Sequence, residues 1–281
     1  MQSRCTPYGL FAACGSAGWA GESSIELSDK EKRHTRLDMN YLCALAQQLN
    51  THPVLMPRLR FYPNNSTYMV GETMRYVEYS YEKNRRVHQI TGVHYSVYLE
   101  RVLKEAETGA RIKDLAALLI TDEITEEEAE NFIQELIQSQ LLVSELEPAV
   151  TGDEFSYQLI RSLKAINEEH HPEIERIIHL LEKAQQEIDE LDDQESNTAE
   201  AYRTIYAELK TLETPIEENQ LFQTDLYRST QQASLDSGIQ KQLSAAIAFL
   251  DKFSPAGESA NLKKFKENFY NQYENAELPL L

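Results

Sequence analysis

The sequence predicts an α+β fold that contains a winged helix-turn-helix and a long helical hairpin. Two observations predict the winged helix. Alternating apolar residues over 58–90 indicate a β-hairpin, and three helical patterns and a short strand follow it directly. A third observation predicts the helical hairpin, because a long amphipathic pattern begins after Pro172 and a second one surrounds Tyr202.

Residues 1–56 form the first of three predicted segments. A stretch rich in Gly, Ala and Ser leads into a short strand at residues 23–28, and residues 37–49 place apolar side chains at helical spacing. Asp38 lies at the start of this helix. Its carboxylate is expected either to cap the first turn or to belong to a polar site.

Residues 57–150 are the expected winged helix. Thr125, followed by Glu128, forms the capping box that opens its third helix. The expected elements are, in order, a hairpin of residues 74–81 and 85–90 with its loop at 82–84, helices at 93–107, 112–120 and 125–140, and a strand at 141–143.

Residues 151–281 are expected to be mostly helical. Asp225 interrupts an apolar strand at residues 221–227, and burying a carboxylate costs several kcal/mol unless it is paired. Asp225 is therefore expected either to turn outward or to have a bound partner. The helices expected here span residues 172–191, 202–209, 243–253 and 262–270.

The charge of the chain limits its partners. The formal net charge is −19, and the predicted helix at 125–140 contains neither Lys nor Arg, so phosphate would repel it and we expect no DNA binding. No apolar stretch approaches the roughly 20 residues needed to span a bilayer. Three cysteines (Cys5, Cys14 and Cys43) lack metal-site or disulfide spacing, which favours reduced thiols in the cytoplasm.

The common catalytic and cofactor motifs are missing from the sequence. It contains no P-loop, no G-x-G-x-x-G, no G-x-S-x-G and no H-E-x-x-H. His170 and His171 make a poor metal pair, because adjacent residues on a helix point in different directions. We therefore expect no metal and no cofactor. Arg4 and Thr6, which flank a Pro-Tyr-Gly turn, are polar residues that local structure does not explain.

The predicted hairpin is basic, unlike the helix that follows it. It carries Arg75, Lys83, Arg85 and Arg86. A strand edge beside a helical groove can bind an extended peptide as an added strand. Composition leaves two interpretations open: a peptide-docking edge, and an ordinary exposed hairpin.

Five strings resemble the class I lantibiotic dehydratase family over essentially the whole chain and in the family's order. They are Arg4-Cys5-Thr6-Pro7-Tyr8-Gly9-Leu10-Phe11, His34-Thr35-Arg36-Leu37-Asp38, Arg75-Tyr76-Val77-Glu78-Tyr79, Ser139-Gln140-Leu141-Leu142-Val143-Ser144-Glu145-Leu146 and Gln223-Thr224-Asp225-Leu226-Tyr227. The resemblance implies enzymes that transfer glutamate from glutamyl-tRNA to Ser or Thr of a ribosomal precursor peptide. A separate domain then eliminates the glutamate.

The resemblance also implies site residues. By motif, Arg4, Thr6, Asp38 and Asp225 are expected to be catalytic residues of the glutamylation site, where a guanidinium can hold a phosphate or carboxylate through two bonds. The family's winged helix is its leader-peptide recognition element. The residues expected to bind the leader are Arg85, Arg86, Val87, His88, Gln89, Ile90, Phe132 and Leu136.

The family's enzymes are much longer than this chain, and their elimination domain has no counterpart here. We therefore expect that the chain alone does not catalyse glutamylation, and that it meets glutamyl-tRNA only through a full-length enzyme. Two other functions remain open: a stand-alone peptide-binding module of a split modification system, and an acidic winged-helix regulator. A homodimer also remains open.

Overall fold

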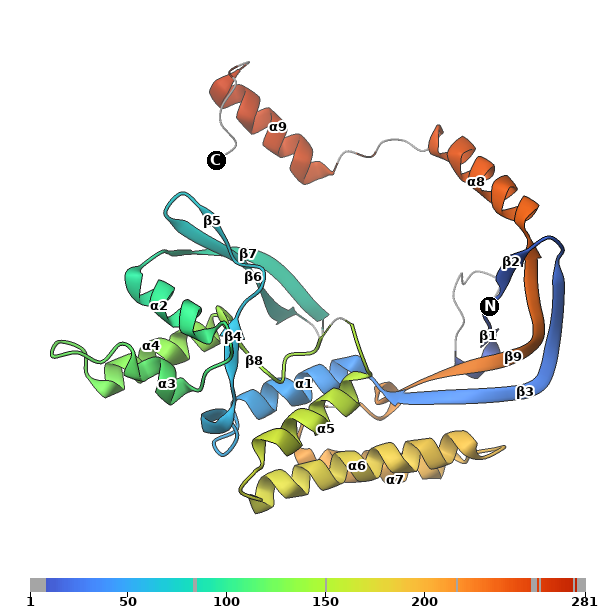
Figure 1. Ribbon diagram of the computed structural model, residues 1–281, viewed down its shortest axis with the longest axis horizontal. Coiled ribbons are helices and arrows are strands. Elements are labelled where there is room, and N and C mark those ends of the chain that lie inside the picture. Colours follow the sequence, from blue (N-terminus) through green and yellow to red (C-terminus); the bar gives the residue numbers. More distant parts are fainter. Residues whose placement is uncertain are drawn as a thin grey trace. The chain divides into compact units, whose positions relative to one another are not determined.

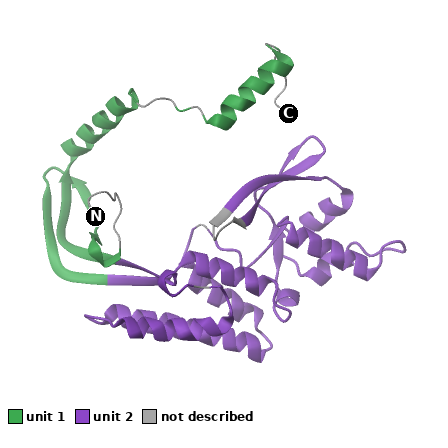
Figure 2. Cartoon of the chain, turned by 180° about the vertical axis from the view of Figure 1, so that it is seen from behind, with its two compact units in different colours: residues 1–32, 226–281 green, residues 33–225 purple. Residues whose placement is uncertain are grey.

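The computed structural model describes residues 9–82, 85–149, 151–215, 217–253, 257, 259–274 and 276. Of residues 81, 82, 85 and 86 only the backbone is described. The chain divides into a larger unit, residues 33–225, and a smaller unit, residues 1–32 with 226–281 (Figure 2). Two long strands, β3 (Ser24–Leu37) and β9 (Phe222–Asp236), each contribute to both units.

The larger unit mixes helices with short sheets, which confirms the α+β class. Its helices are α1 (Met39–Asn50), α2 (Val97–Ala106), α3 (Ile112–Ala117), α4 (Glu126–Gln138), α5 (Phe155–Ile166), α6 (Pro172–Asp193) and α7 (Ala199–Leu209), with 3-10 turns η2 (Met56–Arg58), η3 (Lys210–Leu212) and η4 (Glu218–Gln220). Its further strands are β4 (Phe61–Pro63), β5 (Tyr68–Val70), β6 (Thr73–Glu82), β7 (Arg85–His94) and β8 (Leu142–Ser144).

Two antiparallel sheets lie wholly within the described part of this unit. β4 pairs with β8, and β6 lies between β5 and β7 (Figure 1). The predicted order of hairpin, three helices and strand is therefore present, and both halves of the capping box at Thr125 and Glu128 are formed. The winged helix-turn-helix assignment stays a prediction, as does the functional division into residues 1–56, 57–150 and 151–281.

The core of the larger unit is mainly aliphatic. α6 buries Ile174, Ile177, Leu181 and Ile188 on one face, as its sequence periodicity predicts. α6 contacts both α5 and α7, so the predicted helical hairpin is confirmed. α6 also begins as predicted, with Pro172 in its first turn, where a missing N–H costs nothing.

In its described residues, the smaller unit consists of a sheet followed by two helices. β1 (Ala13–Cys14) and β2 (Gly18–Ala20) pair in parallel with β9, and β3 pairs with β9 as well. A 3-10 turn, η1 (Gly9–Phe11), precedes β1. After β9 come α8 (Ser237–Asp251) and α9 (Ala260–Tyr273).

Several predicted boundaries are wrong, and the cause is long-range pairing. The strands expected at 23–28 and 221–227 extend to Leu37 and Asp236, because β3 and β9 pair with each other. The helix expected at 93–107 begins only at Val97, because the residues before it continue β7. Local periodicity reports only which face of an element is apolar, so it does not show where a distant partner extends it.

Candidate functional site

A charged pair lies where β3 ends and β9 begins. The Arg36 Nη2 atom is 2.9 Å from the Asp225 Oδ2 atom, with 27% of the arginine side chain and 24% of the aspartate side chain exposed. Asp225 therefore has the partner that a partly buried carboxylate requires. Asp225 was expected either to turn outward or to have a bound partner, and the structure shows the partner.

Thr35 fixes the backbone beside this charged pair. Its hydroxyl donates to Asp192 Oδ1 at 2.6 Å, and its main-chain N–H donates to Asp192 Oδ2 at 2.5 Å. The same hydroxyl lies 3.2 Å from the Thr224 hydroxyl. Thr35 is 2% exposed. Because Thr35 precedes Arg36 and Thr224 precedes Asp225, these bonds hold both charged residues in position.

Asp38 caps α1, which confirms its expected structural role. Its Oδ1 atom accepts the Asn40 main-chain N–H at 2.8 Å and the Asn40 side-chain N–H at 2.9 Å. Its own main-chain N–H donates to the Leu221 carbonyl at 2.7 Å. Asp38 thus also ties the start of α1 to the residue before β9. Its assignment to a catalytic site, like that of Asp225, stays a prediction.

Arg4 and Thr6 lie outside the described residues. Thr35 and Arg36 were not singled out from the sequence, although they belong to the string His34-Thr35-Arg36-Leu37-Asp38. A signal was present there, since three polar residues directly precede a buried leucine and a helix cap. Polar residues in that position need partners when the strand is packed on both sides.

A cavity of about 550 Å³ lies next to this cluster, between the end of β3, α1 and the start of α5. Its volume is in the range of small-molecule sites, roughly 300–1,000 Å³. The lining mixes apolar with charged side chains and includes Arg36, Met39, Leu42, Glu154 and Phe155. The Glu154 Oε1 atom is 2.5 Å from the His34 Nε2 atom.

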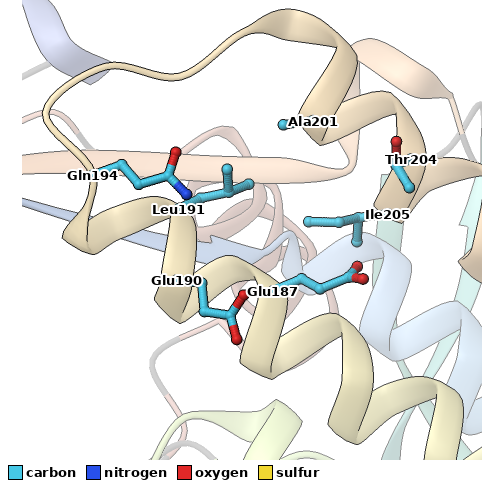
Figure 3. A pocket seen from close by; sticks show the side chains of 7 residues that line it. All are labelled: Glu187, Glu190, Leu191, Gln194, Ala201, Thr204 and Ile205. Carbon is cyan, nitrogen blue, oxygen red and sulfur yellow. The ribbon is translucent and has the colours of Figure 1, made fainter.

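A smaller cavity, of about 220 Å³, lies between α6 and α7 (Figure 3). Glu187 from α6 and Thr204 from α7 are among the residues that line it. Beside it, Lys183 pairs with Glu208 of α7 and lies 3.7 Å from Glu187, and the hydrogen bond that Lys183 donates to Glu208 raises the pKa of the Lys183 ammonium group. These pairs join the two helices, and no predicted site residue lines this cavity.

The strand predicted to bind a peptide is an edge strand. Among the described residues, β7 pairs with β6 alone. The other side of β6 is occupied, first by β5 and then by polar side chains. Val77 donates its N–H to Ser66 Oγ at 2.9 Å, and its carbonyl accepts from Asn64 Nδ2 at 3.0 Å. The Gln140 side chain bonds the N–H and the carbonyl of Tyr79 at 3.0 and 2.8 Å.

These contacts show which main-chain groups of β7 face outward. In an antiparallel pair, two directly opposite residues are oriented alike. If the main-chain N–H and C=O of one point away from the partner strand, those of the other also point away from it. Val77 and Tyr79 bond away from β7, and they lie opposite Ile90 and His88. The N–H and carbonyl groups of Ile90 and His88 therefore point to the free edge.

The remaining predicted peptide-binding residues differ in accessibility. On β7, Val87, His88, Gln89 and Ile90 are all exposed, whereas the side chains of Arg85 and Arg86 lie outside the described residues. Gln89 donates to Glu78 Oε1 at 2.6 Å.

On α4, Phe132 lines an apolar cavity of about 310 Å³ between α2 and α4. Leu136 is 6% exposed and belongs to the core. Because Leu136 packs against other side chains of this chain, little of its surface is accessible to a docked peptide.

His170 and His171 have separate local roles. The His171 side chain accepts the Glu173 N–H at the start of α6, and the His170 Nδ1 atom is 2.7 Å from the Glu175 Oε1 atom. In the part of the chain that the structure describes, no three His, Cys, Asp or Glu side chains are grouped as a metal site would require. No described helix is long and apolar enough to cross a membrane.

Comparison with known proteins identifies the family. The family described as lantibiotic dehydratase, N terminus, matches residues 1–281. The chain belongs to the lantibiotic dehydratase family. It is 25% identical, over 274 residues, to the nisin biosynthesis protein NisB of Lactococcus lactis subsp. lactis, a match that covers 96% of this chain and 26% of NisB.

The crystal structure of MibB, a tRNA-dependent lantibiotic dehydratase from Microbispora sp. 107891, shares the fold of this chain. The TM-score is 0.69 at 17% sequence identity, and the match covers 96% of this chain and 26% of MibB. The family resemblance stated from the sequence is thereby confirmed. This chain spans about a quarter of the length of both relatives.

Proposed function

We propose that this chain takes part in the glutamylation of Ser and Thr side chains of a ribosomal precursor peptide, with glutamyl-tRNA as the donor. The family match over residues 1–281 supports this function, and so does the fold shared with MibB, which is itself tRNA-dependent. Since the chain spans only a quarter of these relatives, we assign the complete reaction to a larger assembly.

In this proposal Arg4, Thr6, Asp38 and Asp225 belong to the glutamylation site. Arg36 holds the Asp225 carboxylate at 2.9 Å, which fixes one acidic group near the end of β3. A carboxylate so placed can bind the glutamyl ammonium group or orient an arginine that contacts phosphate. No cofactor is needed for such a transfer, because the glutamyl ester of the tRNA is already activated.

We also assign the leader peptide to the free edge of β7. The observation that carries this assignment is the difference between the two sides of the hairpin: β6 is occupied by β5 and polar side chains, whereas β7 pairs with β6 alone among the described residues. An extended peptide would bond the main chain at His88 and Ile90. The exposed side chains of Val87 and Ile90, together with Phe132, would contact its side chains.

A fluorescence-polarisation titration with labelled leader peptides encoded near the gene tests this assignment. Ile90→Pro removes an outward N–H and leaves the bonds to β6, because proline is tolerated on the open side of an edge strand. We expect at least a tenfold weaker affinity. Ile90→Ala is the matched control, since it keeps the N–H and loses only side-chain contact. Equal binding by wild type and Ile90→Pro would contradict strand addition.

Glutamyl transfer is tested separately with glutamyl-tRNA and the precursor peptide. We expect no glutamylated product from this chain alone, and product once the rest of the dehydratase is supplied. Asp225→Asn should then lower the yield strongly. Product from the chain alone would contradict the assignment to a larger assembly. Firm, sequence-specific binding to duplex DNA would support the regulator instead.

A further inference from the structure

The last residues of β3 make different contacts on the two faces of the strand. Arg33 and Thr35 bond to the end of α6. Successive side chains of a strand point to opposite faces, so His34 and Arg36 point the other way. On that face Arg36 pairs with Asp225. One face of β3 is therefore held by α6, and the other face carries the charged pair of the candidate site.

Arg33 caps the end of α6. Its guanidinium donates to the Leu191 carbonyl at 2.9 Å and to the Gln194 carbonyl, and Figure 3 labels both of these residues at this end of the helix. Carbonyls in the last turn of a helix lack partners within the helix, and the helix dipole favours a cation there. Helix capping is therefore enough to explain the contact between Arg33 and α6.

Asp192 lies in the same turn, and helix capping does not explain it. The helix dipole disfavours an anion near the C-terminal end of a helix. Both carboxylate oxygens of Asp192 accept from Thr35, which is 157 positions away in the chain: one accepts the main-chain N–H at 2.5 Å and the other the hydroxyl at 2.6 Å. The contribution of Asp192 is therefore tertiary, because it fixes one residue of β3.

The hydrogen bonds around Thr35 have a defined direction. An ionised carboxylate only accepts, so the Thr35 hydroxyl donates its proton to Asp192. In the 3.2 Å contact between the two hydroxyls, Thr224 is then the donor and Thr35 the acceptor. A chain of hydrogen bonds therefore runs from β9 through β3 to α6. On both strands it involves the residue directly before a member of the charged pair.

We propose that Asp192 is a positioning residue for glutamyl transfer, a role that rests on the function proposed above. It acts through Thr35 and Thr224, which set the positions of Arg36 and Asp225. In the transfer, the ester bond to the tRNA breaks, an ester to the Ser or Thr oxygen forms, and the hydroxyl proton passes to the ribose oxygen of the tRNA. A displacement of about 1 Å at a reaction site can lower the rate of such a step about 100-fold.

The test replaces Asp192 in two ways. Asp192→Ala removes both bonds to Thr35. Asp192→Asn keeps the shape, because its oxygen can accept the Thr35 N–H and its amide can donate to the Thr35 hydroxyl. The matched control is Asp193→Ala, which removes the same charge from an exposed position of the same turn and leaves the bonds to Thr35 in place.

Steady-state glutamyl transfer, with the rest of the dehydratase supplied, gives kcat and the KM for glutamyl-tRNA. We expect Asp192→Ala to lower kcat by about tenfold or more, and to change the KM and the leader-peptide affinity by less than about twofold. Asp192→Asn should restore kcat to within about threefold of wild type, and Asp193→Ala should match wild type. Should Asp192→Ala not fold, Thr224→Val tests the same chain of bonds, and we expect it to lower kcat as well.

Three results would overturn the proposal. They are a wild-type kcat in Asp192→Ala or, if that variant does not fold, in Thr224→Val; equal losses in Asp192→Ala and Asp193→Ala; and equal losses in Asp192→Ala and Asp192→Asn. A wild type that transfers no glutamate with the rest of the dehydratase present would instead contradict the proposed function.

A second measurement does not depend on activity. A double-mutant cycle of Arg36→Ala and Asp225→Asn in urea denaturation gives the coupling between these two side chains. We expect this coupling to fall to less than about half in the Asp192→Ala background and to stay unchanged in the Asp193→Ala background. An unchanged coupling in both backgrounds would show that Asp192 does not position the pair.

Discussion

The Arg36 guanidinium and the Asp225 carboxylate, 2.9 Å apart, join the end of β3 to the start of β9. The residues directly before them, Thr35 and Thr224, bring their hydroxyls within 3.2 Å of each other. Successive residues of a strand point to opposite faces. The two strands are therefore linked on both faces at the position where the glutamylation site is proposed.

The charged pair should make a modest contribution to stability. We expect Arg36→Ala and Asp225→Asn each to lower the free energy of unfolding by about 1 kcal/mol, because about a quarter of each side chain is exposed and water screens the pair. Urea denaturation of both variants and of the double variant measures the coupling. Purely additive losses would show that the two side chains do not interact in solution.

Thr35 should matter more than Arg36 for stability. Thr35→Val keeps the shape of the side chain but removes the hydroxyl, which leaves the Asp192 carboxylate short of one donor. We expect a loss of about 1–3 kcal/mol in the free energy of unfolding. The control is Thr204→Val, because the exposed Thr204 side chain donates its hydroxyl to the Glu200 carbonyl of its own helix. Similar losses in both variants would argue against the link to α6.

Gln140 makes favourable side-chain hydrogen bonds but has an unfavourable backbone conformation. Its φ of 59° lies in the left-handed region, while its side-chain amide makes two bonds to Tyr79. Gln140→Ala loses the bonds and keeps the strain, whereas Gln140→Gly loses the bonds and relieves it. We expect the alanine variant to be less stable than the glycine variant by about 1 kcal/mol in urea denaturation. An alanine variant more stable than the glycine variant would show that the backbone at position 140 is not strained.

Glu128 should make stability depend on pH. The hydrogen bonds from the Thr125 main-chain N–H, and then from its hydroxyl, lower the pKa of Glu128 below its ordinary value of 4.5. A depressed pKa in the folded state stabilises the protein above the unfolded pKa, and this stabilisation disappears as pH falls through the folded pKa. Glu128→Gln should therefore be less stable than wild type at pH 7, and the difference should shrink below pH 4.5.

The control for this prediction is Glu127→Gln, at a neighbouring exposed position of the same turn. Thermal unfolding measured across the pH range compares the three proteins. A difference between wild type and Glu128→Gln that stays constant with pH would show that the capping carboxylate is not the cause.

Much of the candidate site could be inferred from the sequence, but its contacts could not. That Asp38 caps a helix and that Asp225 needs a partner follow from local chemistry. The identity of that partner, Arg36, follows only from the pairing of β3 with β9. The sequence predicts a peptide-binding edge at β7. That the outer edge of β6 is occupied could not be predicted, because it depends on Gln140, which is distant from Tyr79 in sequence.

The sequence by itself determined the family, the helices and their caps, because periodicity and capping involve residues a few positions apart. Tertiary structure alone decided the lengths of β3 and β9, the partner of Asp225 and the cavity beside Arg36. The physical reason is that strand pairing and side-chain contact join residues far apart in the chain, and no local pattern specifies which distant residue a polar group will meet.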